Sequence, residues 1–462
     1  MNQLPDRPAD LLLTGRFEVD EDQVYRHVPF EMPADITQFH LRYGYSDQIG
    51  SDPWLAGGNT LDIGVFDQRG HATGSAGFRG WSGSAKAAFT IGREWATPPY
   101  RSAEIEPGGW FILLGPYKVG PRGLDYRIEI WLNPGLENDQ TEPGSILPHA
   151  RPTLPPALEP GWLRGDLHSH TLYSDGDSWP SEVLAAAART GLDFLAITDH
   201  NSARQPQLPN GRAGLPILIP GVEITTYGGH WNAWGVARWF EFRDPTTAGT
   251  QAAFDDAVAT GALVSINHPK PLGPDWSYGE LSGNHAIEIW NGPWAGLNSD
   301  SLAYWETRLK RGERVIAIGG SDTHNLKSPR HRLLHPELGG PTTWVKVDGD
   351  PTPAAILAAI RRGDCFVSAS PAGPQLVIDR LGDEIRLRTA GANGATLMAL
   401  SDRGSEAAFA IPSADWETAI PFPPGVRYLR AQILDAAGTM LTVSNPVWAR
   451  EELLERANKS FF

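Results

Sequence analysis

The stretch Gly165-Asp166-Leu167-His168-Ser169-His170-Thr171-Leu172-Tyr173-Ser174-Asp175-Gly176 decides how the rest of the chain is interpreted. The apolar pair Trp162 and Leu163 leads into it, which predicts a strand that ends in polar side chains. Residues two apart in a strand point to the same side, so His168 and His170 are expected to project together. Asp175 follows after a turn that brings it back beside them. Two imidazoles and a carboxylate in one space predict a metal site without cysteine. The alternative is a pair of surface histidines beside a solvated aspartate.

Polar side chains able to bind metal also follow most of the later apolar segments. They are Asp199 and His200 after 194–198, Glu223 after 217–219, His230 at the start of the next strand, His268 after 262–266, and Asp322 and His324 after 315–318. Alternating strands and helices predict a parallel sheet curled into a barrel, where such residues meet at the carboxyl ends of the strands. With His168 and His170, six of the 13 histidines fall in or beside such places, which favours one shared metal centre. Asp199 is expected to orient a ligand. His230 also fits a packed aromatic position.

Changes in composition divide the chain into four parts. Residues 1–134 alternate apolar and polar positions between turn residues, which predicts an antiparallel β-sandwich. Residues 135–161 form a proline-rich linker, 162–370 the α/β barrel, and 371–462 a small C-terminal β-sandwich and tail. Aromatic side chains of the first part, such as Trp81, are expected to pack against the neighbouring domain, with ligand binding as the alternative.

Charge and cysteine content exclude several classes of protein. The net charge of −15 disfavours nucleic acid as a general partner. The single cysteine, Cys365, excludes an intramolecular disulfide framework. The sequence shows neither an apolar stretch of membrane-spanning length nor the pattern of a secretory signal. We therefore expect a cytoplasmic enzyme that acts on a small molecule, and the sequence leaves its oligomeric state open.

The metal-binding pattern resembles a known family. His168-Ser169-His170-Thr171 with Ser174-Asp175-Gly176 resembles the first motif of the PHP (polymerase and histidinol phosphatase) superfamily of metal-dependent hydrolases. The later motifs resemble the branch that includes carbaryl hydrolases. The resemblance covers about residues 162–370 and implies a distorted seven-stranded (β/α) barrel that holds two or three divalent ions. Many members of the family have histidine where this chain has Asp175.

The resemblance also implies how the ligands are shared among the ions. The first ion would use His168, His170, Glu223 and Asp322; the second would share Glu223 and add His230 and His268; the third would use Asp175, His200 and His324. These nitrogen and oxygen ligands suit Zn, Mn or Fe without choosing among them. Glu223 and Asp322 are expected to be the catalytic carboxylates, because a shared carboxylate serves two cations.

Three functions are compatible with these residues. The first is a phosphoesterase in which a metal-bridging hydroxide attacks the phosphoester, with Lys270 and Arg330 expected to hold the phosphate. Ordinary solvated charges are the alternative for these two cations. The second is a hydrolase of carbamates or carboxylic esters, which the carbaryl-hydrolase branch implies and which aromatic residues such as Trp276 and Trp294 would suit. The third is a carbohydrate-binding or surface-binding protein in which the metal is structural.

Overall fold

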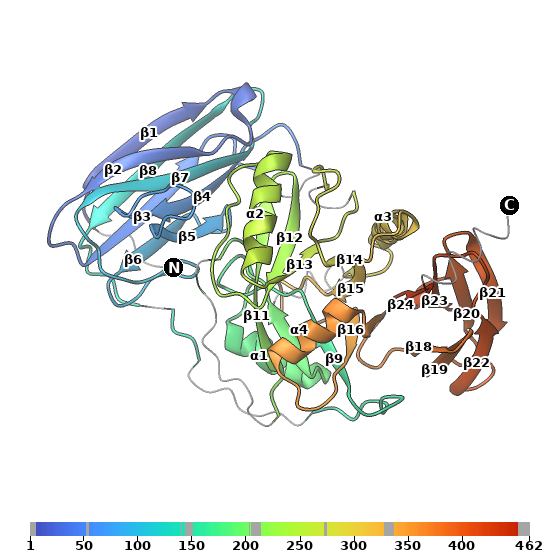
Figure 1. Cartoon of the computed structure of the whole chain (residues 1–462). Helices are drawn as coiled ribbons and strands as arrows, with labels where there is room; N and C mark the ends of the chain where they lie inside the picture. Colours follow the sequence, from blue (N-terminus) through green and yellow to red (C-terminus); the bar gives the residue numbers. More distant parts are fainter. Residues whose placement is uncertain are drawn as a thin grey trace.

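The structure, a computed structural model, describes residues 6–51, 55–138, 140–143, 151–202, 204, 214–271, 275–327 and 337–450. The fold is mixed α/β and rich in strands, with four α-helices in these ranges. Figure 1 shows N-terminal strands in blue, a central body in green and yellow that carries helices, and C-terminal strands in orange and red. None of the described helices is both long and apolar enough to cross a bilayer.

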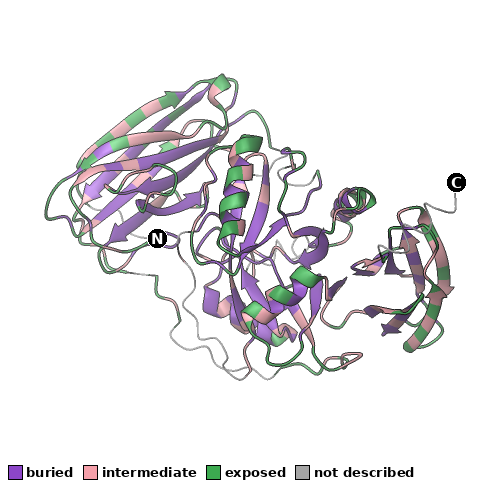
Figure 2. Cartoon of the chain, viewed as in Figure 1, coloured by how far each residue is buried: buried purple, intermediate pink, exposed green. Residues whose placement is uncertain are grey.

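Residues 11–132 form two four-stranded antiparallel sheets, which confirms the strands predicted there. In spatial order, one sheet contains β1 (Leu11–Phe17), β8 (Leu124–Leu132), β3 (Gln38–Tyr45) and β6 (Ala88–Gly92). The other contains β2 (Arg26–Met32), β7 (Gly108–Lys118), β4 (Thr60–Phe66) and β5 (Phe78–Gly83), and the short helix η1 (Val19–Glu21) connects β1 with β2. Side chains of both sheets, among them Phe39 and Trp110, share one buried apolar core. Burial on one face and exposure on the other explain the alternating sequence pattern of β1 and β8, whereas β4 and β5 are buried throughout (Figure 2).

Eight strands of the central body lie side by side in the order β15-β14-β13-β12-β11-β10-β9-β16. Their bounds are β9 (Trp162–Asp166), β10 (Phe194–Ile197), β11 (Ile217–Thr226), β12 (Gly229–Trp234), β13 (Leu263–Ile266), β14 (Ala286–Asn291), β15 (Ile316–Gly320) and β16 (Thr342–Lys346). The predicted parallel pairing is wrong for β12 and β16, which run antiparallel to their neighbours. At β12 the reason is local, because Tyr227 and Gly228 turn the chain straight back from β11.

The two ends of this row of strands meet through a side chain. The Thr343 hydroxyl on β16 donates to the Gly319 carbonyl on β15 at 2.7 Å and accepts from the Gly319 amide at 2.9 Å. Within the described ranges, no backbone ladder joins β15 to β16. The closed seven-stranded barrel therefore stays a prediction.

Four helices cover the central strands (Figure 1). They are α1 (Pro180–Thr190), α2 (Thr247–Ala259), α3 (Asn298–Lys310) and α4 (Pro353–Arg362). Helix α1 begins at a proline and ends at Gly191, whose φ of 85° is left-handed. This confirms the predicted start and stop, since proline suits the first helical position and glycine the residue after the last.

The C-terminal strands continue the central sheet. Strand β17 (Cys365–Ser368) pairs with β16 on one side and β24 (Met440–Ser444) on the other, so the sheet runs on through β23 (Tyr428–Leu434), β20 (Thr396–Ser401) and β21 (Gly404–Ala410). Strand β25 (Val447–Trp448) pairs with β23, and β18 (Gln375–Leu381), β19 (Glu384–Ala390) and β22 (Asp415–Pro421) form a separate sheet. The sheet thus crosses the predicted boundary at 370, because the free edge of β17 is extended by β24. The domain limits themselves stay predictions.

The β2-β7-β4-β5 sheet packs against the central body through aromatic side chains. The ring of Phe78 lies 4.7 Å from that of Trp239 and 5.9 Å from that of Phe242, measured between centroids. Trp81 also contacts Phe242, at 5.9 Å, which agrees with the packing role expected for this tryptophan. The hydroxyl of Tyr227, which directly follows β11, donates to Asp62 on β4 at 3.0 Å, and this bond places the N-terminal strands beside the carboxyl end of β11.

Candidate metal centre

The nine predicted metal ligands converge on one region of the central body. Their nitrogen and oxygen atoms form four overlapping groups, within each of which the atoms lie within 4.8 Å of one another. The groups are His170, Asp175, His200 and His324; His168, His268 and Asp322; His168, His170 and Glu223; and His200, Glu223 and His230. The sharing of residues between groups indicates a single compact centre.

The ends of β9 and β15 are joined directly below the centre. The His170 amide donates to the Thr323 carbonyl, and the Asp322 amide donates to the His168 carbonyl, both at 2.9 Å. The buried Asp166 carboxylate, at the end of β9, accepts hydrogen bonds from the amides of His168 (3.1 Å) and Ser321 (2.9 Å). The ligands on these two strands are therefore held by one backbone framework.

Glu223, near the middle of β11, is the hub of the centre. Its two carboxylate oxygens face different histidines. Oε1 lies near His230 Nδ1 (3.2 Å), His168 Nε2 (3.3 Å) and His268 Nε2 (3.5 Å), and Oε2 lies near His200 Nδ1 (2.8 Å) and His170 Nε2 (3.5 Å). A carboxylate whose oxygens face separate sets of ligands is placed to bridge two cations.

Asp322 brings a second carboxylate to the same histidine pair. Its Oδ1 lies 3.0 Å from His170 Nε2 and 3.3 Å from His168 Nε2. Asp322 has a φ of 55° and His268 a φ of 28°, both in the left-handed region that non-glycine residues rarely adopt. Such conformations concentrate at functional sites, where the surrounding structure holds them in place.

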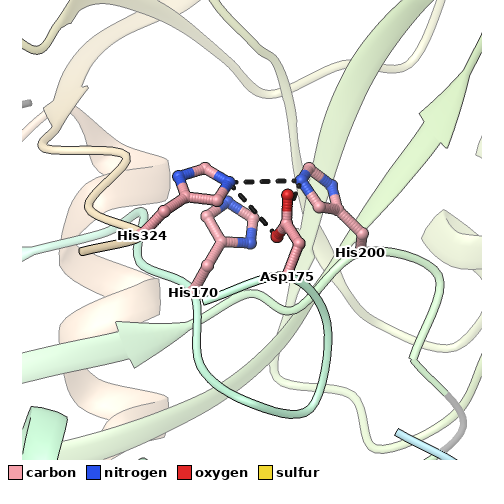
Figure 3. A group of neighbouring side chains, drawn as sticks. All are labelled: His170, Asp175, His200 and His324. Carbon is pink, nitrogen blue, oxygen red and sulfur yellow. Dashed lines mark hydrogen bonds and ion pairs between the residues drawn. The ribbon is translucent and has the colours of Figure 1, made fainter. Parts of the chain in front are cut away.

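A third cluster lies beside these residues and is drawn in Figure 3. His324 Nε2 is 3.3 Å from Asp175 Oδ1 and 3.4 Å from His200 Nε2, and His200 Nε2 is 3.6 Å from the same Asp175 oxygen. The His170 ring stacks on the rings of His324 and His200, with centroids 4.0 and 4.2 Å apart. The structure thus brings together the three residues expected at the third site, with His170 as their neighbour.

These residues fit divalent ions. Two ligand atoms that each lie about 2.0 Å from a tetrahedral ion are about 3.3 Å apart, close to the separations found here. Glu223 Oε2 and Asp322 Oδ1 are buried and lack a well-formed hydrogen bond with any described residue. Buried carboxylate oxygens without such bonds are costly unless a cation satisfies them.

The electrostatics of the centre hold Glu223, Asp322 and His170 in metal-binding forms, whereas the facing carboxylates, against the effect of burial, raise the pKa of His168 and raise the pKa of His200 to about 9. Burial acts to raise the pKa of Glu223, but His168 and His200 hold it well below its usual value. Burial likewise acts to raise the pKa of Asp322, but His168 and His170 lower it well below its usual value. Burial lowers the pKa of His170 to about 3, helped by His324 and His200. Ionised carboxylates and a neutral imidazole are the forms that coordinate metal.

Several supporting residues escaped the sequence analysis. Glu288 on β14 is buried and lies 3.1 Å from His168 Nδ1, so it orients the ring and leaves Nε2 toward the centre. The Asn267 amide donates to Glu223 Oε1 at 2.9 Å, and Thr225 Oγ1 lies 2.5 Å from His200 Nδ1. A usable signal existed for Glu288, because it is the one charged residue in the apolar stretch Ala286-Ile287-Glu288-Ile289-Trp290.

Asp199 supports the loop that carries Asp175. Its carboxylate accepts hydrogen bonds from the Thr171 amide and hydroxyl, both at 2.7 Å, and from the Ser174 hydroxyl at 2.8 Å. The expected orienting role therefore takes the form of fixing the turn between His170 and Asp175.

The structure describes only one of the two residues predicted to bind phosphate, Lys270 and Arg330. Lys270 is buried, and its ammonium donates to the Asn291 carbonyl (3.0 Å), Asn298 Oδ1 (3.1 Å) and Asn291 Oδ1 (3.3 Å). The expectation of an open loop cation thus differs from the structure, and substrate binding would require the ammonium to leave these oxygens. Arg330 lies outside the described residues.

The aromatic residues considered for an aryl group pack against other rings. Trp276 contacts Tyr278, with ring centroids 5.3 Å apart, and Trp294 contacts Trp290 at 4.8 Å. These contacts agree with the packing alternative.

Comparisons with known proteins give short matches. No family model matches the chain. A segment of 65 residues is 46% identical to the 5′-3′ exoribonuclease Rnm of Escherichia coli, and covers 13% of this chain and 22% of that protein. A segment of 119 residues is 28% identical to the DNA polymerase/3′-5′ exonuclease PolX of Bacillus subtilis, and covers 24% of this chain and 20% of that protein. The chain therefore spans about a fifth of the length of these relatives.

One solved structure similar to this chain is a two-domain protein from Bacteroides vulgatus that contains a predicted PHP-like metal-dependent phosphoesterase. It is 19% identical, with a TM-score of 0.39, and the match covers 65% of this chain and 99% of that one.

Proposed function

We propose that the chain is a metal-dependent phosphoesterase of the PHP type. The observation that carries the proposal is the position of Glu223, whose two oxygens face separate sets of histidines inside a group of nine nitrogen and oxygen ligands. One structural ion needs about four protein ligands. A larger set that shares carboxylates suits a cluster of two or three ions, for which Zn, Mn and Fe are all chemically suitable.

The proposed assignment follows the family resemblance. His168, His170, Glu223 and Asp322 would hold the first ion, and Glu223 with His230 and His268 the second. Asp175, His200 and His324 would hold the third. When bound, divalent ions activate water as a nucleophile at neutral pH and neutralise charge that develops on the substrate.

The chain's own residues prepare this chemistry. Glu288 fixes His168, Asn267 fixes Glu223, and Asp199 fixes the loop that carries Asp175. Held ligands reduce the reorganisation needed when a substrate arrives, which is the main source of electrostatic catalysis. The names of the relatives matched over short segments, an exoribonuclease and a polymerase with exonuclease activity, agree with phosphoester cleavage.

The test joins metal analysis to a panel of substrates. Protein purified without chelator is expected to contain at least two divalent ions per chain by elemental analysis. It should hydrolyse aryl phosphomonoesters or phosphodiesters faster than aryl esters or carbamates. Well-folded protein that accepts only one equivalent of metal would contradict the multinuclear centre. Faster turnover of carbamates or carboxylic esters would replace the phosphoesterase with the second candidate.

A further inference from the structure

A cavity of about 470 Å³ lies between the metal centre and the N-terminal strands. The ligand residues Asp175, His200 and His230 line its central side, and residues that include Asp62 and Ser84 line the opposite side. This volume is in the range of small-molecule sites. A molecule whose reacting bond lies at the metal ligands would therefore extend to the N-terminal wall.

The lining of this cavity carries acidic side chains but neither lysine nor arginine. Among the described residues that line it, Asp62 and Asp175 are the carboxylates, and His200 and His230 are predicted metal ligands. The other lining residues are apolar residues, glycines or residues with hydroxyl or amide groups. An anionic group at the wall opposite the metal centre would therefore face Asp62 without a cation in the lining to pair with. This charge pattern disfavours a second anionic group on the molecule that fills the cavity.

Asp62 on β4 presents an open acceptor at the N-terminal wall. Its Oδ2 accepts a hydrogen bond from the Tyr227 hydroxyl at 3.0 Å, which fixes the carboxylate across the junction. Its Oδ1 accepts no hydrogen bond from the described residues and, unlike Glu223 Oε2, is not fully enclosed by protein atoms. Because Asp62 lines the cavity, this oxygen can accept a hydrogen bond from a bound molecule.

Other hydroxyl groups of the lining already have partners. Ser82 Oγ lies 2.9 Å from the Tyr100 hydroxyl, and Thr225 Oγ1 lies 2.5 Å from His200 Nδ1. The Ser84 hydroxyl, in the turn between β5 and β6, has no hydrogen-bond partner in the described ranges of the chain. The N-terminal wall thus offers an unused carboxylate oxygen and an unused hydroxyl group to a bound molecule.

An unused carboxylate oxygen requires a hydrogen-bond donor, either an ammonium or a hydroxyl group. An ammonium would share the cavity with two or three divalent ions, whose charge exceeds that of the carboxylates Asp175, Glu223 and Asp322, so it would be repelled. A hydroxyl group is neutral, and it can donate to Asp62 while it accepts from Ser84. Hydrogen bonds to a carboxylate are among the strong ones in proteins. The chemistry of the wall therefore favours a hydroxyl group.

We propose that Asp62 is a specificity-determining residue that binds a hydroxyl group of the substrate, whose leaving group is a neutral polyol or sugar. This inference rests on the proposed function and narrows its substrate class. The ester group would lie at the metal ligands, and the hydroxyl-bearing part would fill the cavity. The N-terminal strands would then select the leaving group, while the ligand residues hold the ions.

The test measures binding without turnover, with four phosphonates of matched chain length. They are 3,4-dihydroxybutylphosphonate, which is a non-hydrolysable analogue of glycerol phosphate, butylphosphonate, 4-phosphonobutyrate and 3-aminopropylphosphonate. Each is titrated calorimetrically into the metal-loaded full-length wild type and into Asp62→Ala, Asp62→Asn and Asp415→Ala. Asp415 is an exposed aspartate at the start of β22 and serves as the matched control. Metal content and melting temperature are measured alongside.

The wild type should bind the dihydroxy compound about tenfold more tightly than butylphosphonate, the size of one charge-assisted contact. It should bind 4-phosphonobutyrate most weakly, because that compound ends in a second anion. Asp62→Ala should lose the preference for the dihydroxy compound, and Asp415→Ala should keep it. Asp62→Asn should recover part of it, because an amide also forms hydrogen bonds with a hydroxyl group and keeps an acceptor for Tyr227. A merely structural role of Asp62 would weaken all four compounds equally and leave their ratios unchanged.

Two other results would overturn the inference. One is equal affinity of the wild type for the dihydroxy compound and butylphosphonate, or a preference that persists in both Asp62 variants. The other is tightest binding of 3-aminopropylphosphonate, which would assign the cavity to a cationic group.

Failure of the proposed function looks different. Wild-type protein that shows the preference but hydrolyses no phosphoester contradicts the function and leaves the role of Asp62 in binding. Metal-loaded protein that binds none of the phosphonates contradicts both.

Discussion

Glu223 places one negative charge among five of the histidine ligands of the metal centre. Five histidine nitrogens lie within 3.5 Å of its oxygens. For Glu223→Gln, which preserves size but removes the charge, we expect metal content below two ions per chain. Turnover should fall at least about a hundredfold, because the ions lose their shared anion. Elemental analysis and steady-state kinetics measure both effects.

The control for Glu223→Gln is Glu417→Gln on the exposed face of β22, which should change neither quantity. Circular dichroism should show both variants folded, since the apolar strands are untouched. Full metal content with full turnover in Glu223→Gln would contradict the bridging role.

Asp62 predicts a pH dependence of stability. Burial raises the pKa of Asp62 to about 7, although the hydrogen bond from Tyr227 opposes the rise. The unfolded carboxyl titrates near about 3.9, so the folded state binds this proton more tightly. The stabilising contribution is complete below about pH 4 and is lost as the pH rises through about 7.

Asp62→Asn removes this titration and retains an acceptor for Tyr227. The melting temperature of the variant minus that of the wild type should therefore increase from pH 4 to about pH 7.5. Other titrating groups cancel in the difference. A difference that stays constant over this range would show that the folded and unfolded states bind this proton equally, and so would contradict a raised pKa of Asp62 in the folded protein.

At the scale of elements, Lys270 ties the loop after β13 to the end of β14 and the start of α3. Asn291 in turn donates to Glu288 Oε2 at 3.3 Å and to Asp322 Oδ2 at 3.2 Å, so the network reaches the ligands. Lys270→Met removes one of two donors from the Asn291 carbonyl and from Asn298 Oδ1, and it removes the donor of the buried Asn291 Oδ1. We expect a loss of about 1–3 kcal/mol in the free energy of unfolding. Metal affinity should fall about tenfold, because Asp322 and the partner of His168 lose support. Denaturant unfolding and competition with a chelator measure the two effects.

Burial makes the hydrogen bonds of Lys270 important for stability. It lowers the pKa of Lys270 to about 8, although the negative charges of Glu288 and Asp322 act to raise that pKa. Lys310→Met, at an exposed lysine of α3, is the matched control. A stable Lys270→Met variant with unchanged metal affinity but weaker phosphate binding would return Lys270 to the substrate-binding role predicted from the sequence.

Periodicity and strand ends explain which elements the sequence predicts well. His168, Glu223 and Asp322 each belong to a short apolar strand or follow one directly, and strand ends converge in such sheets, so their grouping is foreseeable. The hairpin at Tyr227 and the pairing of β17 with β24 cannot be predicted in this way. Each depends on which strand edge is free to form hydrogen bonds in the folded chain.

The whole molecule is held together by an aromatic junction between the β2-β7-β4-β5 sheet and the central body. Phe66, Phe78 and Leu113 are fully buried in the same cluster as Val222 and Trp231. Removing residues 1–150 would expose this apolar surface, so we expect aggregation of the remainder.

Phe78→Ala is a milder test of that junction. It should destabilise the protein by about 3–5 kcal/mol, as expected for loss of a buried aromatic ring. Leu12→Ala, at an exposed position of β1, should change stability little. Thermal melting compares the two variants. An unaffected Phe78→Ala protein would show that the two parts are energetically independent.

A cavity of about 470 Å³, lined by Asp175 and His230 on one side and by Asp62 and Trp81 of the N-terminal strands on the other, has an evolutionary consequence. All nine ligand residues fall between positions 168 and 324, whereas the opposite wall comes from positions 48–117. Different codons therefore specify the metal ligands and the opposite wall of the cavity. Drift or laboratory selection acting on residues such as Gln48, Ser84 and Ala85 would change which molecules fit the cavity while the metal-ligand residues stay intact. Recombination between related genes would exchange selectivity in a single event, provided that the Asp62–Tyr227 hydrogen bond is inherited by both partners.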